Sequence, residues 1–208
     1  GKAVLVQAMD DIPDLSWYGV GVANNGGGTD GQEYQFPAIS VEAFEVVWLV
    51  RDDLAYSNYF GADYGSNGIV LIASSDISQN GDDAIELYFN GTVVDLYGDP
   101  NVDGSGEAWE YKDSWAFRNC NPHGTLPTPS LTFDLSQWTL GEVDCTDNTE
   151  NNDPFDENSN PYGSSCPFPV DEFCDNQSSG PLSYSLSFDG VDDWSEAPAI
   201  DLTGQIFT

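Results

Sequence analysis

Basic side chains are scarce in this sequence. Four lysine and arginine residues stand against 36 aspartate and glutamate residues, which gives a formal net charge of -32 at pH 7. Such an excess repels both the phosphates of nucleic acids and anionic membrane surfaces, so we expect no nucleic-acid partner. The charge also opposes compaction through self-repulsion, which divalent cations and salt relieve. A saline or calcium-rich exterior therefore suits the chain.

Long apolar runs and the motifs of common catalytic sites are also missing. No window holds the roughly 18 continuous apolar residues that a spanning helix needs, so we expect no membrane insertion. The start at Gly1 has no charged-then-apolar leader, which predicts a mature or excised chain. The sequence lacks serine-hydrolase, zinc-protease and P-loop motifs. Acids are plentiful enough for a glycosidase, but no paired arrangement marks one. We expect a protein that is not an enzyme.

Cysteines occur only in the second half of the chain, among Asn, Pro, Gly and Asp residues. They are even in number, they contain no CxxC pair, and the only histidine, His123, lies in a Pro and Gly turn; disulfides are therefore favoured over zinc. Four cysteines allow three connectivities. We expect Cys120 bonded to Cys145 and Cys166 bonded to Cys174. Disulfides form in oxidising compartments, which predicts an extracellular or cell-surface location.

Short runs rich in β-branched and aromatic residues, separated by turn residues, predict an all-β fold, an antiparallel β-sandwich or barrel. One helical turn is expected over residues 54–60, with Asp52 or Asp53 as its N-cap. The expected strands are residues 2–9, 18–22, 34–36, 41–50, 69–73, 84–89, 92–97, 109–117, 130–133, 138–140 and 182–188.

The dipeptide Asn90-Gly91 separates two alternating runs and favours a two-residue hairpin turn with positive φ angles. Counting from this turn sets Glu86 directly opposite Asp95, where like charges are destabilising unless a cation lies between them. The candidate cations are the four basic residues, Arg118 first, or a bound Ca²⁺; two solvated carboxylates are the alternative. The same count places six side chains on the buried face: Ile85, Leu87, Phe89, Thr92, Val94 and Leu96.

The loop after this hairpin resembles a calcium-binding loop. Asp99, Asn101, Asp103 and Glu110 fit the spacing D-x-N-x-D-G-x5-E, with glycine where a sharp turn is needed. Calcium is therefore the candidate cofactor. The alternative is a glycine-rich turn in which Asp and Asn cap their own backbone. Glu110 also has Lys112 two residues further along the strand, and a pair between them would satisfy both without metal.

A second group of acids lies next to the cysteines, and calcium or plain solvation are its alternatives. Its members are Asp144, Asp147, Asp153, Asp156 and Asn158.

Three stretches together resemble the lamin-tail domain of large secreted bacterial modular proteins. They are NNGGGTDGQEYQFP at residues 24–37, NGDDAIELYFNGTVVDLYGDPNVDGSGEAWEYKDSWAFR at 80–118 and FDLSQWTL at 133–140. The resemblance covers Lys2 to about Thr149, although the opening KAVLVQAMDDI departs from the family pattern. It implies an immunoglobulin-like antiparallel β-sandwich without catalytic residues. In bacteria such modules occur beside extracellular nucleases, phosphatases and adhesion-type repeats.

A second resemblance concerns SLSFDGVDDWSEAPAIDLTGQIFT at residues 185–208, which is similar to the first strands of a laminin-G or concanavalin-like domain. The expected organisation is therefore a lamin-tail-like sandwich over residues 1–149, an acidic cysteine-containing linker over 150–181, and the start of a second β-sandwich over 182–208.

These features predict a non-catalytic module of a large secreted or cell-surface protein that acts in scaffolding or adhesion. Its expected partners are other domains of the same parent chain and surface proteins or glycans. The alternative is an accessory domain of an extracellular hydrolase, of nuclease or phosphatase type, whose catalytic domain lies outside this segment.

Overall fold

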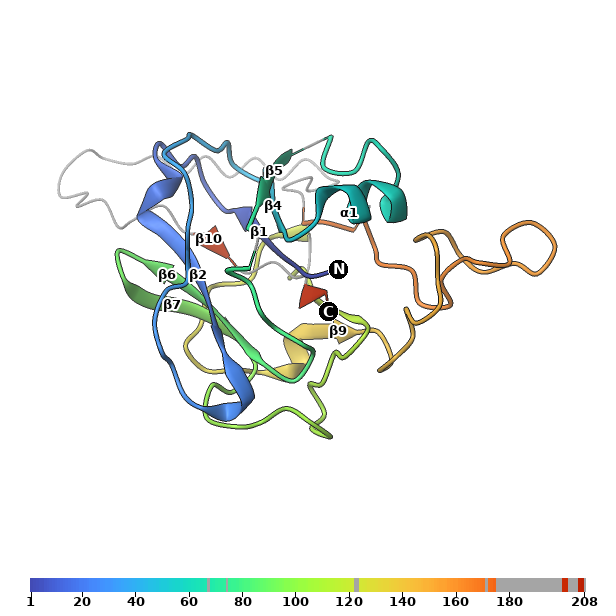
Figure 1. Cartoon of the computed structure of the whole chain (residues 1–208). Coiled ribbons are helices and arrows are strands. Elements are labelled where there is room, and N and C mark those ends of the chain that lie inside the picture. The colour runs from blue at the N-terminus through green and yellow to red at the C-terminus, as the bar shows by residue number, and fades with distance from the viewer. Residues whose placement is uncertain are drawn as a thin grey trace.

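The strands form two sheets that pack face to face, which confirms the expected all-β sandwich (Figure 1). The computed structural model describes residues 1–66, 68–73, 75–121, 124–170, 172–174, 200–201 and 206–207. The larger sheet has the order β5-β4-β1-β11-β8-β9, with β10 also paired to β1, and the smaller sheet has the order β3-β2-β6-β7.

The elements have the following bounds along the chain: β1 (Ala3–Ala8), η1 (Leu15–Trp17), β2 (Tyr18–Ala23), η2 (Asn24–Gly26), β3 (Tyr34–Gln35), β4 (Val46–Val50), α1 (Asp53–Phe60), β5 (Gly68–Ile72), β6 (Ala84–Phe89), β7 (Thr92–Tyr97), β8 (Trp115–Arg118), η4 (Leu135–Gln137), β9 (Trp138–Leu140), β10 (Ile200–Asp201) and β11 (Ile206–Phe207).

The main core lies between the two sheets and follows the two-residue period of the strands. Alternate side chains of β1 and β4 meet alternate side chains of β2 and β6 there, because successive residues of a strand point to opposite faces. Burial of these side chains drives the two sheets together. The residues of this core include Val4, Val6, Val47, Leu49, Val20, Val22, Ile85 and Leu87.

The larger sheet is covered on its second face as well. Leu5 and Trp48 lie on that face and pack with Tyr56 of α1 and with Phe168, which is 2% exposed. Phe168 belongs to a stretch that we call the covering segment, residues 166–170 and 172–174. β1 and β4 are therefore apolar on both faces, which is typical of strands buried between two layers.

Helix α1 connects β4 to β5, and these two strands are parallel, whereas every other strand pair among the described residues is antiparallel. The Asp52 side chain accepts a hydrogen bond from the backbone N–H of Ala55 at 3.0 Å. The expected N-cap is thus confirmed. The helix is two turns long rather than one.

The expected hairpin turn is confirmed. Asn90 and Gly91 have φ angles of 48° and 77°, the positive values that a type I′ turn requires at both central positions. The strands on either side are β6 and β7.

The expected register beyond the turn is wrong, because a β-bulge lies between Leu87 and Tyr88 and their partners in β7. Asp95 lies opposite Leu87, and Glu86 lies opposite Leu96. The extra residue moves Asp95 onto the core face and Leu96 onto the outer face of the smaller sheet. The bulge thereby removes the contact between like charges that strict alternation would impose.

Arg118 of β8 crosses the core and forms an ion pair with Asp95 of β7, with Nη1 and Oδ2 2.6 Å apart. The two side chains are 2% and 0% exposed. Asp95 Oδ1 also accepts the backbone N–H of Ser130, Nη2 donates to Gln137 Oε1, and the guanidinium lies 5.4 Å from the Trp138 ring centroid. Arg118 is thus the cation expected near the hairpin, and its ion pair is with Asp95 and not with Glu86.

Three expected strands are shorter or missing. Of residues 41–50 only Val46–Val50 form β4, because Phe44 has a φ of 67° and turns the chain. Of residues 109–117 only the end enters β8, although Trp109 and Tyr111 are buried in the main core. Residues 130–133 form no strand.

The C-terminal part of the chain is described only at β10 and β11. Both pair with β1, and β11 also pairs with β8, in the larger sheet of the first sandwich. The expected strand at residues 182–188 lies outside the described residues. The division into two domains stays a prediction.

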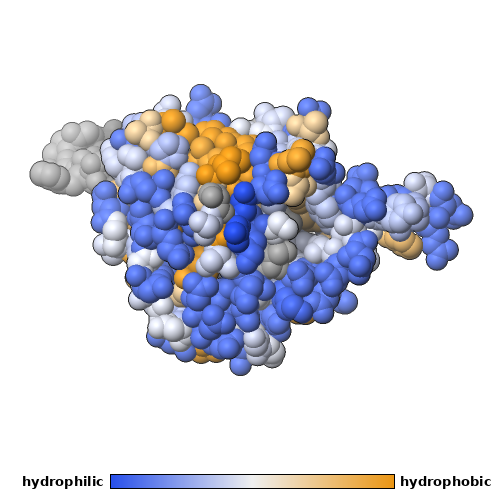
Figure 2. All heavy atoms as spheres, viewed as in Figure 1, coloured by the Kyte–Doolittle hydropathy of each residue, from blue (hydrophilic) through white to orange (hydrophobic). Residues whose placement is uncertain are grey.

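The surface is mostly hydrophilic in the view of Figure 2, apart from an apolar area where Figure 1 places β5. β5 ends the larger sheet, its five residues are GIVLI, and Ile72 is 52% exposed. No described strand pairs with its outer edge. An uncharged edge strand of this kind is a contact-prone part of a sheet.

We expect the substitution Arg118→Met to lower the free energy of unfolding by about 3–5 kcal/mol, because it leaves the Asp95 carboxylate buried without its cation. Urea denaturation measures the change. The double variant Asp95→Asn/Arg118→Met should recover part of the loss. Arg51→Met, which removes an exposed arginine, should stay within about 0.5 kcal/mol of the parent. Equal effects of the two single arginine substitutions would contradict the role given to the ion pair.

Candidate functional site

Three aspartates meet where the chain enters β8 and leaves β9. One ligand oxygen from each of Asp113, Asp144 and Asp147 lies within 4.8 Å of the others, and no other group of three or more acidic, histidine or cysteine side chains converges so closely in the part of the chain that the structure describes. We call these residues the acidic triad. The positive φ angles of Asp113 and Asp144, 43° and 63°, are ones that aspartate tolerates better than most residues.

Backbone hydrogen bonds hold the acidic triad together. The N–H of Asp144 donates to the Lys112 carbonyl at 2.9 Å, and both the N–H and the hydroxyl of Thr146 donate to the Asp113 carbonyl, at 3.1 and 2.8 Å. These bonds join two chain segments that are about thirty residues apart, so the carboxylates are brought together by the fold rather than by a local motif.

Lys112 is the cation beside the acidic triad. Its Nζ lies 3.0 Å from Asp144 and 4.0 Å from Asp113. The hydrogen bond to Asp144 and the nearby negative charges raise the pKa of Lys112. One lysine faces three carboxylates, and clustered carboxylate oxygens are the ligands that Ca²⁺ prefers. The group could therefore hold a hard divalent cation.

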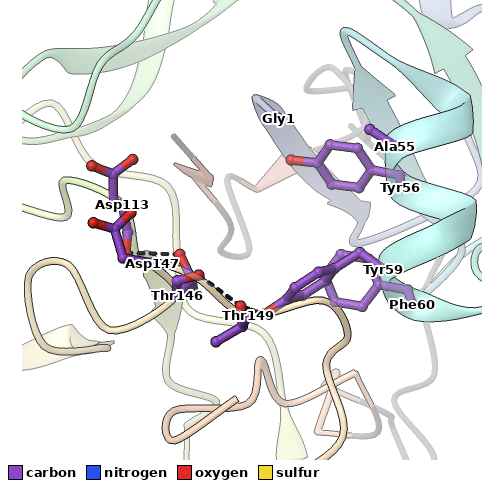
Figure 3. A pocket seen from close by; sticks show the side chains of 9 residues that line it. All are labelled: Gly1, Ala55, Tyr56, Tyr59, Phe60, Asp113, Thr146, Asp147 and Thr149. Carbon is purple, nitrogen blue, oxygen red and sulfur yellow. Dashed lines mark hydrogen bonds between the residues drawn. The ribbon is translucent and has the colours of Figure 1, made fainter. Parts of the chain in front are cut away.

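A pocket of about 290 Å³ opens beside the acidic triad (Figure 3), and we call it the aromatic pocket. Asp113 and Asp147 line one end of it, and the rings of Tyr59 and Phe60 from α1 line the other. The Tyr59 hydroxyl lies 3.1 Å from the Thr149 hydroxyl. Partly buried rings next to carboxylates and hydroxyls can contact the faces and hydroxyls of a small polar ligand such as a sugar. The complete lining is Gly1, Ala55, Tyr56, Tyr59, Phe60, Asp113, Thr146, Asp147 and Thr149.

Tyr56 is not available to a ligand as an ionised group. It is 4% exposed, and burial raises the pKa of its phenol well above the ordinary value. Of five aromatic residues in the first part of the chain, Tyr18 and Tyr56 are buried, while Trp17, Tyr59 and Tyr64 are partly exposed. Of the three partly exposed rings, only Tyr59 lines the aromatic pocket beside the acidic triad.

The residues of the expected calcium loop do not converge on one point. Asp99 Oδ1 accepts the N–H of Asn101 at 2.9 Å, Asp103 Oδ1 accepts the N–H of Ser105 at 3.0 Å, and Glu110 Oε2 accepts the N–H of Gly106 at 2.8 Å. This is the self-capped turn that was the alternative to an ion site. Calcium binding at Asp99, Asn101, Asp103 and Glu110 stays a prediction.

The expected pair between Glu110 and Lys112 is wrong. Lys112 pairs with Asp144 and Asp113 instead, because the segment after β9 passes directly beside it. Of the second acid group, Asp144 and Asp147 enter the acidic triad. Asp113 was missed, since nothing in its local sequence shows that the segment after β9 packs against it.

Both disulfides differ from the expected pairing. Cys120 is bonded to Cys174 across 54 residues, and Cys145 is bonded to Cys166 across 21 residues. Neighbouring cysteines along the chain were expected to pair, but the covering segment runs back under β8, the strand that ends just before Cys120. The bonds therefore attach the covering segment at both of its ends.

We expect peptide mapping without reduction to recover the pairs Cys120 with Cys174 and Cys145 with Cys166. In the chain-entropy treatment, the 54-residue loop contributes about 4 kcal/mol and the 21-residue loop about 3 kcal/mol. Replacing the first pair by serine should therefore lower stability slightly more than replacing the second, as judged by thermal unfolding. Recovery of a peptide that joins Cys120 to Cys145 would overturn the pairing.

No known protein family, curated protein or solved structure matches this chain. Membership of the lamin-tail family thus stays a prediction. Within the described residues, no helix is both long enough and apolar enough to cross a membrane.

Proposed function

We propose that this chain is a non-catalytic β-sandwich module of a larger secreted or cell-surface protein, where it acts in scaffolding or adhesion by contact with proteins or glycans. One observation carries the proposal. All four cysteines form disulfides that lock an Asp- and Asn-rich segment onto the sandwich, as expected of a domain that must keep its shape in an oxidising exterior.

The arrangement of the surface supports this role. The resemblance to lamin-tail domains implies an accessory module, and the strong negative charge disfavours nucleic acid and anionic membranes as partners. The aromatic pocket supplies rings, hydroxyls and carboxylates for contact with a sugar. The acidic triad lies at its edge, where a bound Ca²⁺ would rigidify the two loops that form it.

We expect the purified chain to retain a subset of glycans on an array and to release no product from phosphodiester or phosphomonoester substrates. Tyr59→Ala should weaken glycan retention by about tenfold, because it removes a partly exposed ring from the aromatic pocket. Tyr162→Ala, which removes an exposed tyrosine outside this pocket, should leave retention unchanged. Turnover of either substrate by the purified chain would contradict the non-catalytic role.

Calcium should raise the melting temperature, because an ion that binds only the folded chain stabilises it. At a calcium concentration about 100 times the dissociation constant, the rise should be roughly 5–10 °C, and a chelator should reverse it. Asp147→Asn should reduce this shift, whereas Asp156→Asn, in an exposed turn outside the acidic triad, should not. An unchanged melting temperature, with no ion in the native mass spectrum, removes calcium from the proposal.

A further inference from the structure

A second pocket, on the outer face of the smaller sheet, contains a buried carboxylate that forms no ion pair with a lysine or arginine side chain. Glu86 of β6 points away from the main core and is 1% exposed. Its carboxylate accepts hydrogen bonds from the Thr29 hydroxyl at 2.5 Å and from the Tyr88 hydroxyl at 2.9 Å. Burial raises the pKa of Tyr88, and the bond to Glu86 raises it further, so the phenol stays a donor.

The whole chain has four lysine and arginine residues, and all four are described. Lys112 pairs with the acidic triad, Arg118 pairs with Asp95, and Lys2 donates to the Ser78 carbonyl. None of the ion pairs involves Glu86. Buried carboxylates are normally paired with a cation, so this one is poised to receive a cation from outside.

The loop between β2 and β3, residues 24–33, explains why Glu86 is buried. This loop lies so close to β2 that a Cβ on Gly21 would be 2.6 Å from the Gly31 carbonyl oxygen. Further along, the N–H of Gly28 donates to the Pro100 carbonyl at 2.8 Å and ties the loop to the segment after β7. Glu86 is therefore covered by this loop and does not lie on an open sheet face.

The pocket has a volume of about 470 Å³, within the range of small-molecule sites. We call it the carboxylate pocket. Glu86 and Leu96 are buried and form its floor, while Asp99 and Leu131 are exposed at its rim, with Leu131 63% exposed. The full lining combines carboxylate, hydroxyl and amide groups with apolar side chains: Thr29, Glu86, Val93, Leu96, Gly98, Asp99, Pro100, Asn101, Leu131, Thr132 and Phe133.

We propose that the carboxylate pocket binds an aliphatic ammonium ion, the chemistry of a lysine side chain or of a free alkylamine. The ammonium group hydrogen bonds to Glu86, and its methylene chain lies against Leu96, Leu131 and Phe133. Long cationic side chains bury their methylene stems on apolar surface in this way. A charge-assisted hydrogen bond to a buried carboxylate is among the stronger polar contacts.

An alkylammonium fits this pocket better than Ca²⁺ does. Calcium takes six to eight oxygen ligands, whereas six of the eleven lining residues have no side-chain oxygen. Asp99 Oδ1 already accepts the N–H of Asn101. The ammonium site is inferred from the pocket itself. Only the suggestion that a partner protein supplies the lysine rests on the proposed contact function. The carboxylate pocket shares no lining residue with the aromatic pocket, so the two proposals can fail separately.

The test uses Nα-acetyl-lysine methylamide as the probe and Nα-acetyl-norleucine methylamide, which has the same four side-chain carbons without the amino group, as the neutral control. The whole chain is kept at about 0.15 M salt to screen the surface charge. Calorimetry measures affinity, and NMR shifts locate the site. We expect the lysine probe alone to bind and to shift the signals of Thr29, Glu86 and Leu131. Shifts spread over the acidic surface, or equal binding of norleucine, would overturn the proposal.

Glu86→Gln should weaken binding of the lysine probe by about tenfold or more, because the charge of the acceptor is lost. Glu107→Gln makes the same change at an exposed residue outside the pocket and should leave affinity within about twofold. If Glu86→Gln does not fold, Asp99→Asn and Leu131→Ala replace it in the test, because both change exposed residues of the pocket. Each should weaken binding a few-fold, and unchanged affinity in both would sink the idea.

A final comparison identifies the source of the amine. Tighter binding of the lysine probe than of pentylamine assigns the ligand to a partner protein, and tighter binding of pentylamine assigns it to free amines. Either result supports an ammonium site. Binding of Ca²⁺ at Glu86 without binding of any amine shows a metal site instead and overturns the proposal.

Discussion

The ion pair between Arg118 and Asp95 joins the two sheets of this sandwich and sets how they face each other. Both charges lie in the core, where each would be strongly destabilising alone, so arrangements that separate them are disfavoured. The bulge in β7 serves this pairing, because only the shifted register turns Asp95 toward the core. The same shift places Leu96 instead of Asp95 opposite Glu86 on the outer face. The carboxylate pocket forms around these two residues.

A second constraint is that the larger sheet must be covered on both faces. The strands β1 and β4 are too apolar to face water, and one short helix covers only part of the second face. The covering segment supplies the rest through Phe168 and its neighbours. The disulfides at Cys166 and Cys174, the two ends of that segment, hold these apolar side chains against the sheet. The segment expected to be a linker is thus partly a structural layer.

Local features were predictable from the sequence, and features that depend on contacts between distant segments were not. The Asn90-Gly91 turn, the Asp52 cap and most strands follow from properties of neighbouring residues. The bulge depends on an arginine in the opposite sheet, and the disulfide pairing depends on where the covering segment docks. Asp113 joins its partners only when β8 and β9 pair. The amino-acid sequence shows these residues but does not show which of them come into contact.

The segment between Cys145 and Cys166 projects from the body of the molecule (Figure 1). Because a covalent bond closes it into a ring, a single cut within it by a protease leaves both ends attached, and the two halves of the chain stay joined. Residues added there lengthen the ring without pulling on the sheets, since loop entropy grows slowly with length. The exposed part of the ring, residues 153–159, lies outside the acidic triad and the aromatic pocket, so sequence can change freely there.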